Sequence, residues 1–462
     1  MLFSSIIFIY FFIPLLLLVY FITPAKYRNI PLLIFSLLFY FLGEPKYIIV
    51  LILCCIINYY ISKLMVNKKY KKYKKLLLIL LLIYDIGELL YFKYTDFFIS
   101  NINNIFNTDI SLLHIIMPIG ISFFTFQIIA YVVDVYNGKH KPSKNILDFT
   151  MYVSLFPQLI AGPIVRYADV EKEIIKRETT FSKFSEGIKR FVIGLSKKVL
   201  LANVLGEFAK LLVEETVLSS WIKPILFTLQ IYFDFSGYSD MAIGLGLMLG
   251  FHFLENFNYP LIAKSITDFW RRWHMSLSSW FRDYVYIPLG GNRVSKIKWI
   301  RNLFVVWFLT GFWHGANWNF IIWGLYFGIL LVLEKLILGK YLEKTKVLKY
   351  IYTLIIIIIS FLIFSEESVP EIITNLKNMF FIRDIPLTSL ETNYYLRSYL
   401  ILLIISILGA TPLFRTIINK LKETRLKLII DILEPIYIIS LLLLSTAFLI
   451  DASFNPFLYF RF

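Results

Sequence analysis

The chain has 462 residues, of which 58% are hydrophobic and only 17% are charged, and its mean hydropathy is +0.71. Soluble domains usually contain about 45–50% apolar and about 25% charged residues, so this chain has too little polar surface to cover a water-soluble globule. A soluble enzyme, a coiled coil and a disordered chain are excluded, and the composition predicts a polytopic membrane protein. The net charge of +16 comes from basic residues in loops between apolar runs, which favours membrane orientation over nucleic-acid binding.

Apolar runs of spanning length, or close to it, recur along the whole chain and predict an all-α fold. We expect about 11 transmembrane helices, some of them tilted or re-entrant. Residues 1–22 lack the basic start and the small-residue cleavage site of a removable signal peptide, so we expect them to form the first span. The run at 302–338 is long enough to fold back on itself. The runs lie at residues 1–22, 30–43, 46–62, 76–92, 114–136, 191–213, 221–254, 302–338, 350–365, 393–414 and 428–450.

The distribution of loop charges predicts the orientation of the chain in the membrane. Seven lysines fall in the segment 63–75 after the third run, and further basic loops follow several later runs. The simplest threading places the N-terminus outside the cytoplasm, the lysine-rich segment inside it, and the acidic loop 366–392 on the extracytoplasmic side. Residues 221–290 do not fit a clean alternation, which predicts re-entrant or interfacial helices in this stretch.

Most patterns that carry soluble-enzyme chemistry are missing from the sequence. Cys54 and Cys55, the only cysteines, are neighbours within the run 46–62, which gives neither a disulfide framework nor a metal-binding spacing. We expect them to be packing or lipid-facing thiols. The chain has no serine nucleophile elbow, no HExxH motif and no P-loop, so histidine within the membrane is the catalytic chemistry that remains, without a metal.

A polar island interrupts the run 221–254 at Tyr232–Asp240. Ser236 and Asp240 are four residues apart and share a helix face, whereas Asp234 points elsewhere. The two carboxylates are expected to pair with Arg271 or Arg272, to line a polar tunnel, or to belong to a buried salt-bridge network.

Residues 264–286 show an amphipathic pattern that differs from the apolar runs. The pattern predicts one aromatic-anchored helix that lies in the membrane interface and ends near Pro288, and anchoring alone would explain it equally well. His274 lies at the border of the two faces, where it would be able to point into a cavity. At 100° per residue, one third of the helical circle holds Trp270, Trp273, Leu277, Trp280, Phe281 and Tyr284. The opposite side holds Asp268, Arg271, Arg272, Ser279 and Arg282.

His314 is the strongest single candidate for chemistry. A helix that enters the membrane at Arg301 would carry His314 about 20 Å into a core of about 30 Å. Ionisable groups at such depth cost roughly 2.5–3.5 kcal/mol and are therefore functional candidates. A neutral imidazole there would accept a proton from a hydroxyl, although a hydrogen-bonded packing histidine fits the position equally well.

Several motifs occur in a fixed order and together resemble the membrane-bound O-acyltransferase (MBOAT) family. The similarity is closest to its bacterial alginate O-acetylation (AlgI-like) branch and covers almost the whole chain. The motifs are Met117–Gln127, Phe156–Pro163, Asp234–Asp240, Trp270–His274, Tyr286–Asn292, Trp313–Trp318 and Asn455–Phe462.

The resemblance implies a ring of tilted helices around a thinned centre, with a central tunnel from the cytoplasm to an outward-facing funnel. It implies a single domain over 1–462 with a motif-bearing core at 114–338. His314 corresponds to the essential histidine of the family and His274 to the second, less uniformly required one. Tunnel-lining or substrate contacts are expected at Gln230, Asp234, Ser236, Tyr238, Asp240, Arg271, Arg272, Trp313 and Asn317.

The resemblance also implies a reaction, in which His314 is the general base while an acyl group passes across the membrane. The donor is expected to be acetyl-CoA or another acyl thioester in the cytoplasm, with no tightly bound cofactor. The acceptor hydroxyl is expected on an extracytoplasmic, serine-esterase-like partner or on a cell-surface glycan, at the bacterial inner membrane. Two alternatives stay open: D-alanyl transfer from a carrier protein to teichoic acid, and a solute transporter or flippase.

Overall fold

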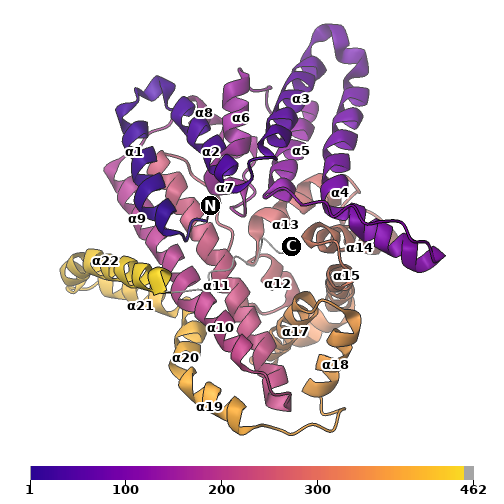
Figure 1. Ribbon diagram of the computed structural model, residues 1–462, viewed down its shortest axis with the longest axis vertical. Coiled ribbons are helices and arrows are strands. Elements are labelled where there is room, and N and C mark those ends of the chain that lie inside the picture. Colours follow the sequence, from indigo (N-terminus) through magenta and orange to yellow (C-terminus); the bar gives the residue numbers. More distant parts are fainter. Residues whose placement is uncertain (1, 452–462) are drawn as a thin grey trace. The chain divides into compact units, whose positions relative to one another are not determined.

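The computed structural model describes residues 2–451, which form helices joined by loops, with no strand in this range (Figure 1). The all-α prediction is confirmed. The motif Asn455–Phe462 lies outside the described residues. Contacts divide the chain into two compact units: the first comprises Met1–Phe191 and Met241–Leu254, and the second comprises Val192–Asp240 and Glu255–Phe462.

The helices follow the apolar runs closely, although several runs are broken into shorter pieces. The first unit contains η1 (Phe8–Phe12), α1 (Ile13–Ile22), η2 (Ala25–Tyr27), α2 (Asn29–Gly43), α3 (Ile48–Val66), η3 (Lys68–Tyr73), α4 (Lys74–Phe106), α5 (Ile121–Asn137), α6 (Ile146–Ser154), α7 (Phe156–Leu159) and α8 (Tyr167–Ile175). Both units receive residues from α9 (Phe181–Ser196) and α11 (Val217–Leu249). The second unit contains η4 (Lys197–Asn203), α10 (Val204–Leu211), η5 (Pro260–Ile262), α12 (Ile266–Trp270), α13 (Met275–Phe281), η6 (Arg282–Tyr286), α14 (Lys296–His314), α15 (Trp318–Leu333), η7 (Glu334–Leu338), α16 (Gly339–Leu342), α17 (Leu348–Ser365), α18 (Val369–Met379), α19 (Leu390–Ser398), α20 (Leu400–Gly409), α21 (Leu413–Lys422) and α22 (Lys427–Asp451).

Apolar helices of spanning size are present, as a membrane protein requires. Among residues 2–451, four helical segments are long and apolar enough to cross a membrane: α3, Trp318–Leu342, α17 and α22. The pair α19 and α20, bent by 58°, makes a fifth if it is one span. The expected number of about 11 spans stays a prediction, because many of the remaining helices are shorter or carry more charge.

The core of the first unit combines aromatic packing with a half-buried arginine. Phe156 at the start of α7 contacts the rings of Phe8 and Phe12, with centroids 6.0 and 5.5 Å away. Arg177 donates to the Tyr20 hydroxyl at 2.8 Å, and this hydroxyl donates to the Leu249 carbonyl at 2.7 Å. These contacts join the N-terminal helices to the end of α11 within this unit. Cys54 and Cys55 are buried on α3, as expected of packing thiols.

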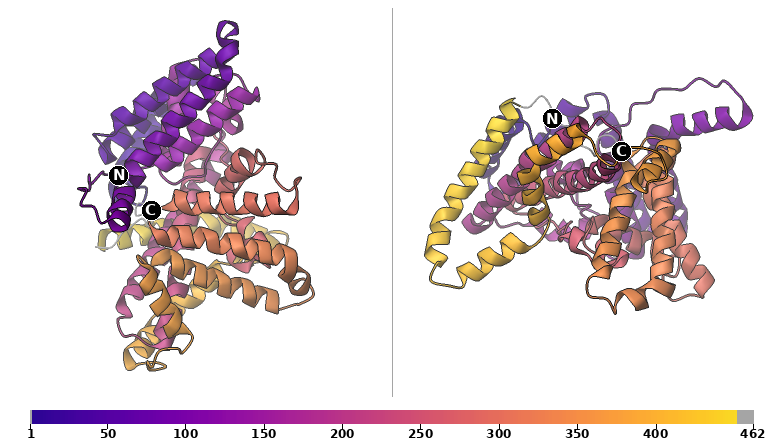
Figure 2. Two further views of the ribbon diagram at one scale, coloured as in Figure 1. Left: turned by 90° about the vertical axis from the view of Figure 1, so that its right-hand side faces the viewer. Right: turned by 90° about the horizontal axis from the view of Figure 1, so that it is seen from below.

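The run 302–338 does fold back, as α14 and α15 form an antiparallel hairpin that turns at 315–317. Two glycines allow the close approach: a Cβ on Gly311 would collide with the Phe320 carbonyl oxygen, and one on Gly324 would collide with the Trp307 carbonyl oxygen. Because these obstacles are backbone atoms, no larger residue fits without separating the helices. In turn, α15 packs against α17, so three helices of the second unit support one another (Figure 2).

The prediction of a single helix over 264–286 is wrong. The segment consists of α12, a break, α13 and η6, and His274 at the break has a left-handed backbone with φ of 44°. Trp270, Trp273 and Trp280 are buried inside the protein rather than presented to lipid. Anchoring in the interface therefore does not explain these aromatic residues, since they belong to the core of the second unit.

Candidate active site

His314 ends α14 in an aromatic enclosure. Its side chain is only 5% exposed, and its ring centroid lies 5.0 Å from Trp313, 5.0 Å from Trp323 and 5.3 Å from Phe364. These neighbours come from α14, α15 and α17, so the hairpin and its support helix build the enclosure together. The rings exclude water from the imidazole, which is the environment in which a general base in a membrane is most effective.

His274 is fully buried at the break between α12 and α13. Its Nδ1 lies 3.2 Å from Oδ1 of Asn256, which also accepts from the backbone N–H and the hydroxyl of Ser276 at 3.2 and 2.9 Å. With Oδ1 of Asn256 as the acceptor, the 3.2 Å contact is a hydrogen bond in the tautomer that carries its proton on Nδ1. Burial lowers the pKa of His274 to about 3, so the ring is neutral at pH 7.

The structure brings the two predicted catalytic histidines to one indole. The ring of Trp313 lies 5.0 Å from that of His314 and 6.1 Å from that of His274, centroid to centroid. All three belong to the second unit, although 40 residues separate the histidines in the sequence. His274, His314 and Trp313 thus form one buried group, and their catalytic roles stay predictions.

Two further tryptophans extend this group. Trp323 contacts the His314 ring and lies 5.6 Å from Trp270, which packs on Trp307 at 4.7 Å. The indole N–H groups of Trp270 and Trp323 are buried and have no hydrogen-bond acceptor within residues 2–451. A buried donor without an acceptor costs free energy, about 1–3 kcal/mol, unless another group meets it. The site therefore offers one N–H donor on the indole beside the candidate base, that of Trp323, and a second on Trp270, which packs behind Trp323.

The two carboxylates of α11 have partners that sequence reasoning missed. Asp234 pairs with Lys198 at 2.7 Å, and both side chains are buried, whereas Asp240 pairs with Lys197 at 2.6 Å. Pairing with Arg271 or Arg272 was the wrong prediction, because Arg272 binds Asp268 one helical turn away and Arg271 is exposed. The alternative of a buried salt bridge is confirmed for Asp234. Lys198 inside the apolar run 191–213 was the available signal for its partner, since a buried lysine needs a counter-charge.

Comparison with known proteins identifies the family of the chain. The sequence model of the MBOAT, membrane-bound O-acyltransferase family, matches residues 143–368. The chain is 41% identical to the probable alginate O-acetylase AlgI of Azotobacter vinelandii over 377 residues, which cover 80% of this chain and 76% of the relative. The chain belongs to the membrane-bound O-acyltransferase family. It is therefore a multi-pass membrane O-acyltransferase, and the matched residues include both histidines.

Other relatives of this acyltransferase differ in substrate. The chain is 35% identical to the peptidoglycan O-acetyltransferase of Helicobacter pylori over 419 residues, 82% of this chain and 80% of the relative. It is 32% identical to the teichoic acid D-alanyltransferase of Bacillus subtilis over 234 residues, 47% of this chain and 59% of the relative.

The remaining predicted tunnel residues of the acyltransferase fall into two groups. Gln230, Ser236 and Tyr238 are buried on α11. Asn317 instead caps α15, accepting from the Trp318 backbone N–H at 2.7 Å and donating to the Glu367 carbonyl at 2.9 Å.

An aromatic residue of the α11 motif, Phe235, contacts His274. The ring of Phe235 lies 4.7 Å from His274 at 86°, and Tyr232 lies 6.3 Å from Trp273. The motif thus supports the site by packing. Among residues 2–451, no group of three or more His, Cys, Asp or Glu side chains is able to hold a metal ion.

Proposed function

We propose that the protein is an O-acetyltransferase that modifies a cell-surface glycan, with His314 as the general base. One observation carries the proposal: His314 and His274 contact the same buried Trp313 within the motif-bearing part of an acyltransferase. The acetyl group and the glycan are inferred from the alginate and peptidoglycan O-acetylating relatives.

The proposed reaction is a transfer between two acyl carriers. His314 takes the proton of the acceptor hydroxyl as its oxygen bonds to the thioester carbonyl carbon. The carbon–sulfur bond then breaks, the acyl group stays on the oxygen as an ester, and the proton passes to the departing thiolate. The indole N–H group of Trp323, which packs on the His314 ring, supplies a donor for the negative charge on the carbonyl oxygen.

The donor is proposed to be acetyl-CoA or another acyl thioester reaching the site from the cytoplasm. The acceptor hydroxyl is proposed to belong to an extracytoplasmic, serine-esterase-like partner, which passes the acyl group to the glycan. The proposed location is the bacterial inner membrane, with the N-terminus outside the cytoplasm as the loop charges favour. Acyl transfer from a thioester to an oxygen ester is close to thermoneutral or favourable, so neither ATP nor an ion gradient is required. Holding both substrates at one site lowers the barrier by about several kcal/mol.

The decisive experiment measures base-labile acetate on purified surface polymers by mass spectrometry. His314→Gln is expected to abolish acetylation in cells that lack the native gene but contain normal amounts of the membrane protein. The matched control is His114→Asn, because His114 is exposed and asparagine tolerates its left-handed backbone, with φ of 50°. Full acetylation by the His314 variant would refute the assignment of the base.

D-alanyl transfer is the second candidate, favoured by the teichoic acid D-alanyltransferase relative. The same polymer preparations distinguish the two candidates, because ester-linked D-alanine and acetate differ in mass. Incubation of membranes with a D-alanyl carrier protein and with acetyl-CoA tests the donor directly. Solute flux that persists without His314, in the absence of any acyl transfer, would instead indicate a transporter.

A further inference from the structure

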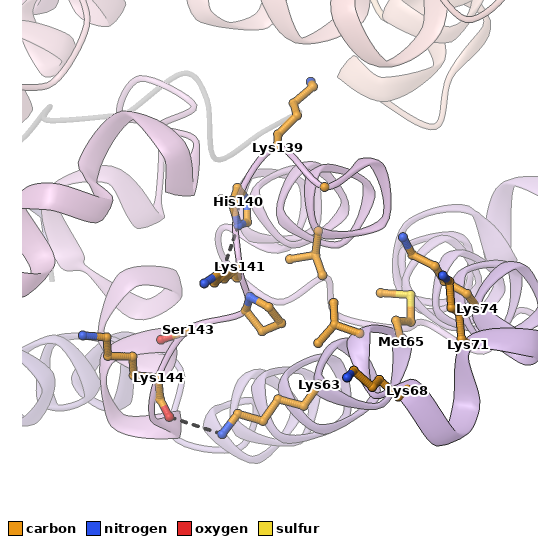
Figure 3. A pocket seen from close by; sticks show the side chains of 14 residues that line it. Lys63, Met65, Lys68, Lys71, Lys74, Lys139, His140, Lys141, Ser143 and Lys144 are labelled. Atoms are coloured by element: carbon orange, nitrogen blue, oxygen red, sulfur yellow. Dashed lines mark hydrogen bonds between the residues drawn. The ribbon is translucent and has the colours of Figure 1, made fainter.

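A lysine-lined hollow lies in the first unit, and none of its lining residues is one proposed for catalysis (Figure 3). It has a volume of about 880 Å³ and is formed by the end of α3, by η3, by the start of α4 and by the loop after α5. Two segments far apart in the sequence, 63–74 and 135–144, thus build one hollow. Its lining residues are Lys63, Met65, Val66, Lys68, Lys71, Lys74, Val135, Gly138, Lys139, His140, Lys141, Pro142, Ser143 and Lys144.

The lining is strongly cationic. Seven of its residues are lysines, and none is an aspartate or glutamate. Lys139 is paired with Asp134 at 2.7 Å outside the lining. The ammonium groups of Lys68, Lys71 and Lys141 are exposed and have no carboxylate at ion-pair distance within residues 2–451.

Part of this charge is held in place by the backbone. Lys63 donates to the Lys144 carbonyl at 3.2 Å, a contact drawn in Figure 3, and lies 4.5 Å from the centroid of the Tyr59 ring. Lys74 donates to the Tyr136 carbonyl at 2.5 Å. Ordering a lysine side chain costs conformational entropy, and the orientation of a membrane protein requires only that basic residues lie in the loop. The arrangement therefore does more than orient the chain.

One wall of the hollow is rigid. The ring of His140 lies 5.3 Å from Tyr131 and 5.1 Å from Tyr167, and its Nδ1 is 3.1 Å from the Lys141 carbonyl. These contacts fix the loop that carries Lys139, Lys141 and Lys144. The loop and the α3–α4 connection therefore both contribute lysines to the lining of the hollow.

We propose that this hollow binds a ligand with clustered phosphate groups, of the pyrophosphate class. Lysine ammonium groups bind phosphate as point charges. A ligand with several phosphates contacts several lysines at once, whereas a ligand with a single carboxylate does not. The volume falls in the range of about 300–1,000 Å³ that is usual for small-molecule sites. The cationic lining also raises the local concentration of anions.

Two sources supply this chemistry: the nucleotide of a coenzyme A thioester and the phosphates of an anionic lipid headgroup. The nucleotide source rests on the proposed function, whereas the site itself does not. Binding is therefore also measured with His314→Gln, which is expected to bind the phosphate ligand unchanged even where acetylation is lost. Failure of the phosphate site and failure of the proposed function then give different results.

The test uses the full-length protein in nanodiscs of phosphatidylcholine. Coenzyme A and inorganic pyrophosphate are titrated by calorimetry, and nanodiscs that contain cardiolipin are analysed by native mass spectrometry for retained lipid. The test variant is Lys68→Gln/Lys71→Gln/Lys141→Gln. The control is Lys340→Gln/Lys344→Gln/Lys346→Gln, which removes the same charge from exposed positions in the second unit.

The proposal expects the test variant, and not the control, to lose about tenfold in affinity, with binding weakened by added salt. Binding of coenzyme A in competition with pyrophosphate supports the nucleotide source, and retention of cardiolipin that the test variant loses supports the lipid source. The proposal is overturned if no probe binds, or if both triple variants bind equally, because the effect would then follow net charge alone.

Discussion

Gly311 and Gly328 lie on the two members of the α14–α15 hairpin and form a matched pair for substitution. A Cβ on Gly311 would collide with the Phe320 carbonyl oxygen and lie 3.2 Å from both Cα and N of Gly324. All of these are backbone atoms, so the helices must separate. A Cβ on Gly328 would meet the Phe304 ring at 3.4 Å and the Trp307 Cβ at 3.5 Å, which are ordinary contacts.

The two alanine substitutions are therefore expected to change the free energy of unfolding in opposite directions. Alanine favours a helix interior over glycine by about 0.8–1.0 kcal/mol, and Gly328→Ala is expected to keep this gain. In Gly311→Ala this gain in helix propensity is outweighed by overpacking, which costs about 1–3 kcal/mol. His314 follows Gly311 by one helical turn, so the separation also displaces the imidazole. A displacement of about 1 Å at a reacting group costs roughly a hundredfold in rate.

The assay compares thermal unfolding in detergent with acetate incorporation into surface polymers for the two variants. Gly311→Ala is expected to unfold at a lower temperature and to lose most activity, whereas Gly328→Ala is expected to unfold at a slightly higher temperature than the wild type and to keep its activity. Equal stability and equal activity of the two variants would refute the close packing of the hairpin as the support of His314.

Three further perturbations test the site. Lys198→Gln or Asp234→Asn alone is expected to cost about 3–5 kcal/mol of unfolding free energy, because each leaves one buried charge without its counter-charge. The double variant is expected to cost less than the sum of the two single variants. Trp323→Phe keeps the aromatic packing but removes the N–H donor, so kcat is expected to fall about tenfold or more with little change in stability. For His274, the folded pKa of about 3 lies below the usual 6.5, so the unfolded state binds the extra proton. Stability is therefore lost as the pH falls from about 6.5 towards 3, by up to about 1.4 kcal/mol per pH unit, and His274→Asn is expected to flatten this dependence.

Each of these expectations has a clear contrary result. Additive losses in the Lys198 and Asp234 cycle would show that the two charges do not interact. Unchanged kcat in the Trp323 variant would remove its N–H from the mechanism. An unfolding temperature of the His274 variant that follows pH as the wild type does would assign the acid sensitivity to other groups.

Much of the site was predictable because the motifs carry it. The sequence identified His314, His274 and Trp313, and the tertiary structure places them together. It also indicated the reversal within 302–338, because that run is too long for one span. The break at His274 was not predictable, since a left-handed residue inside an amphipathic pattern is decided by the contacts of Asn256 and the surrounding core rather than by helical periodicity.

The sequence by itself determined that the protein lies in a membrane, because it has too few charges to face water and its helices are apolar. It also indicated the class of reaction, because a histidine lies in a family motif. Only the tertiary structure decided which groups meet. It paired Asp234 with Lys198 rather than with an arginine, set Trp323 against His314, and joined two lysine segments around one hollow. The physical reason is that hydropathy and periodicity are local properties of a segment, whereas pairing and enclosure depend on packing between segments distant in the chain.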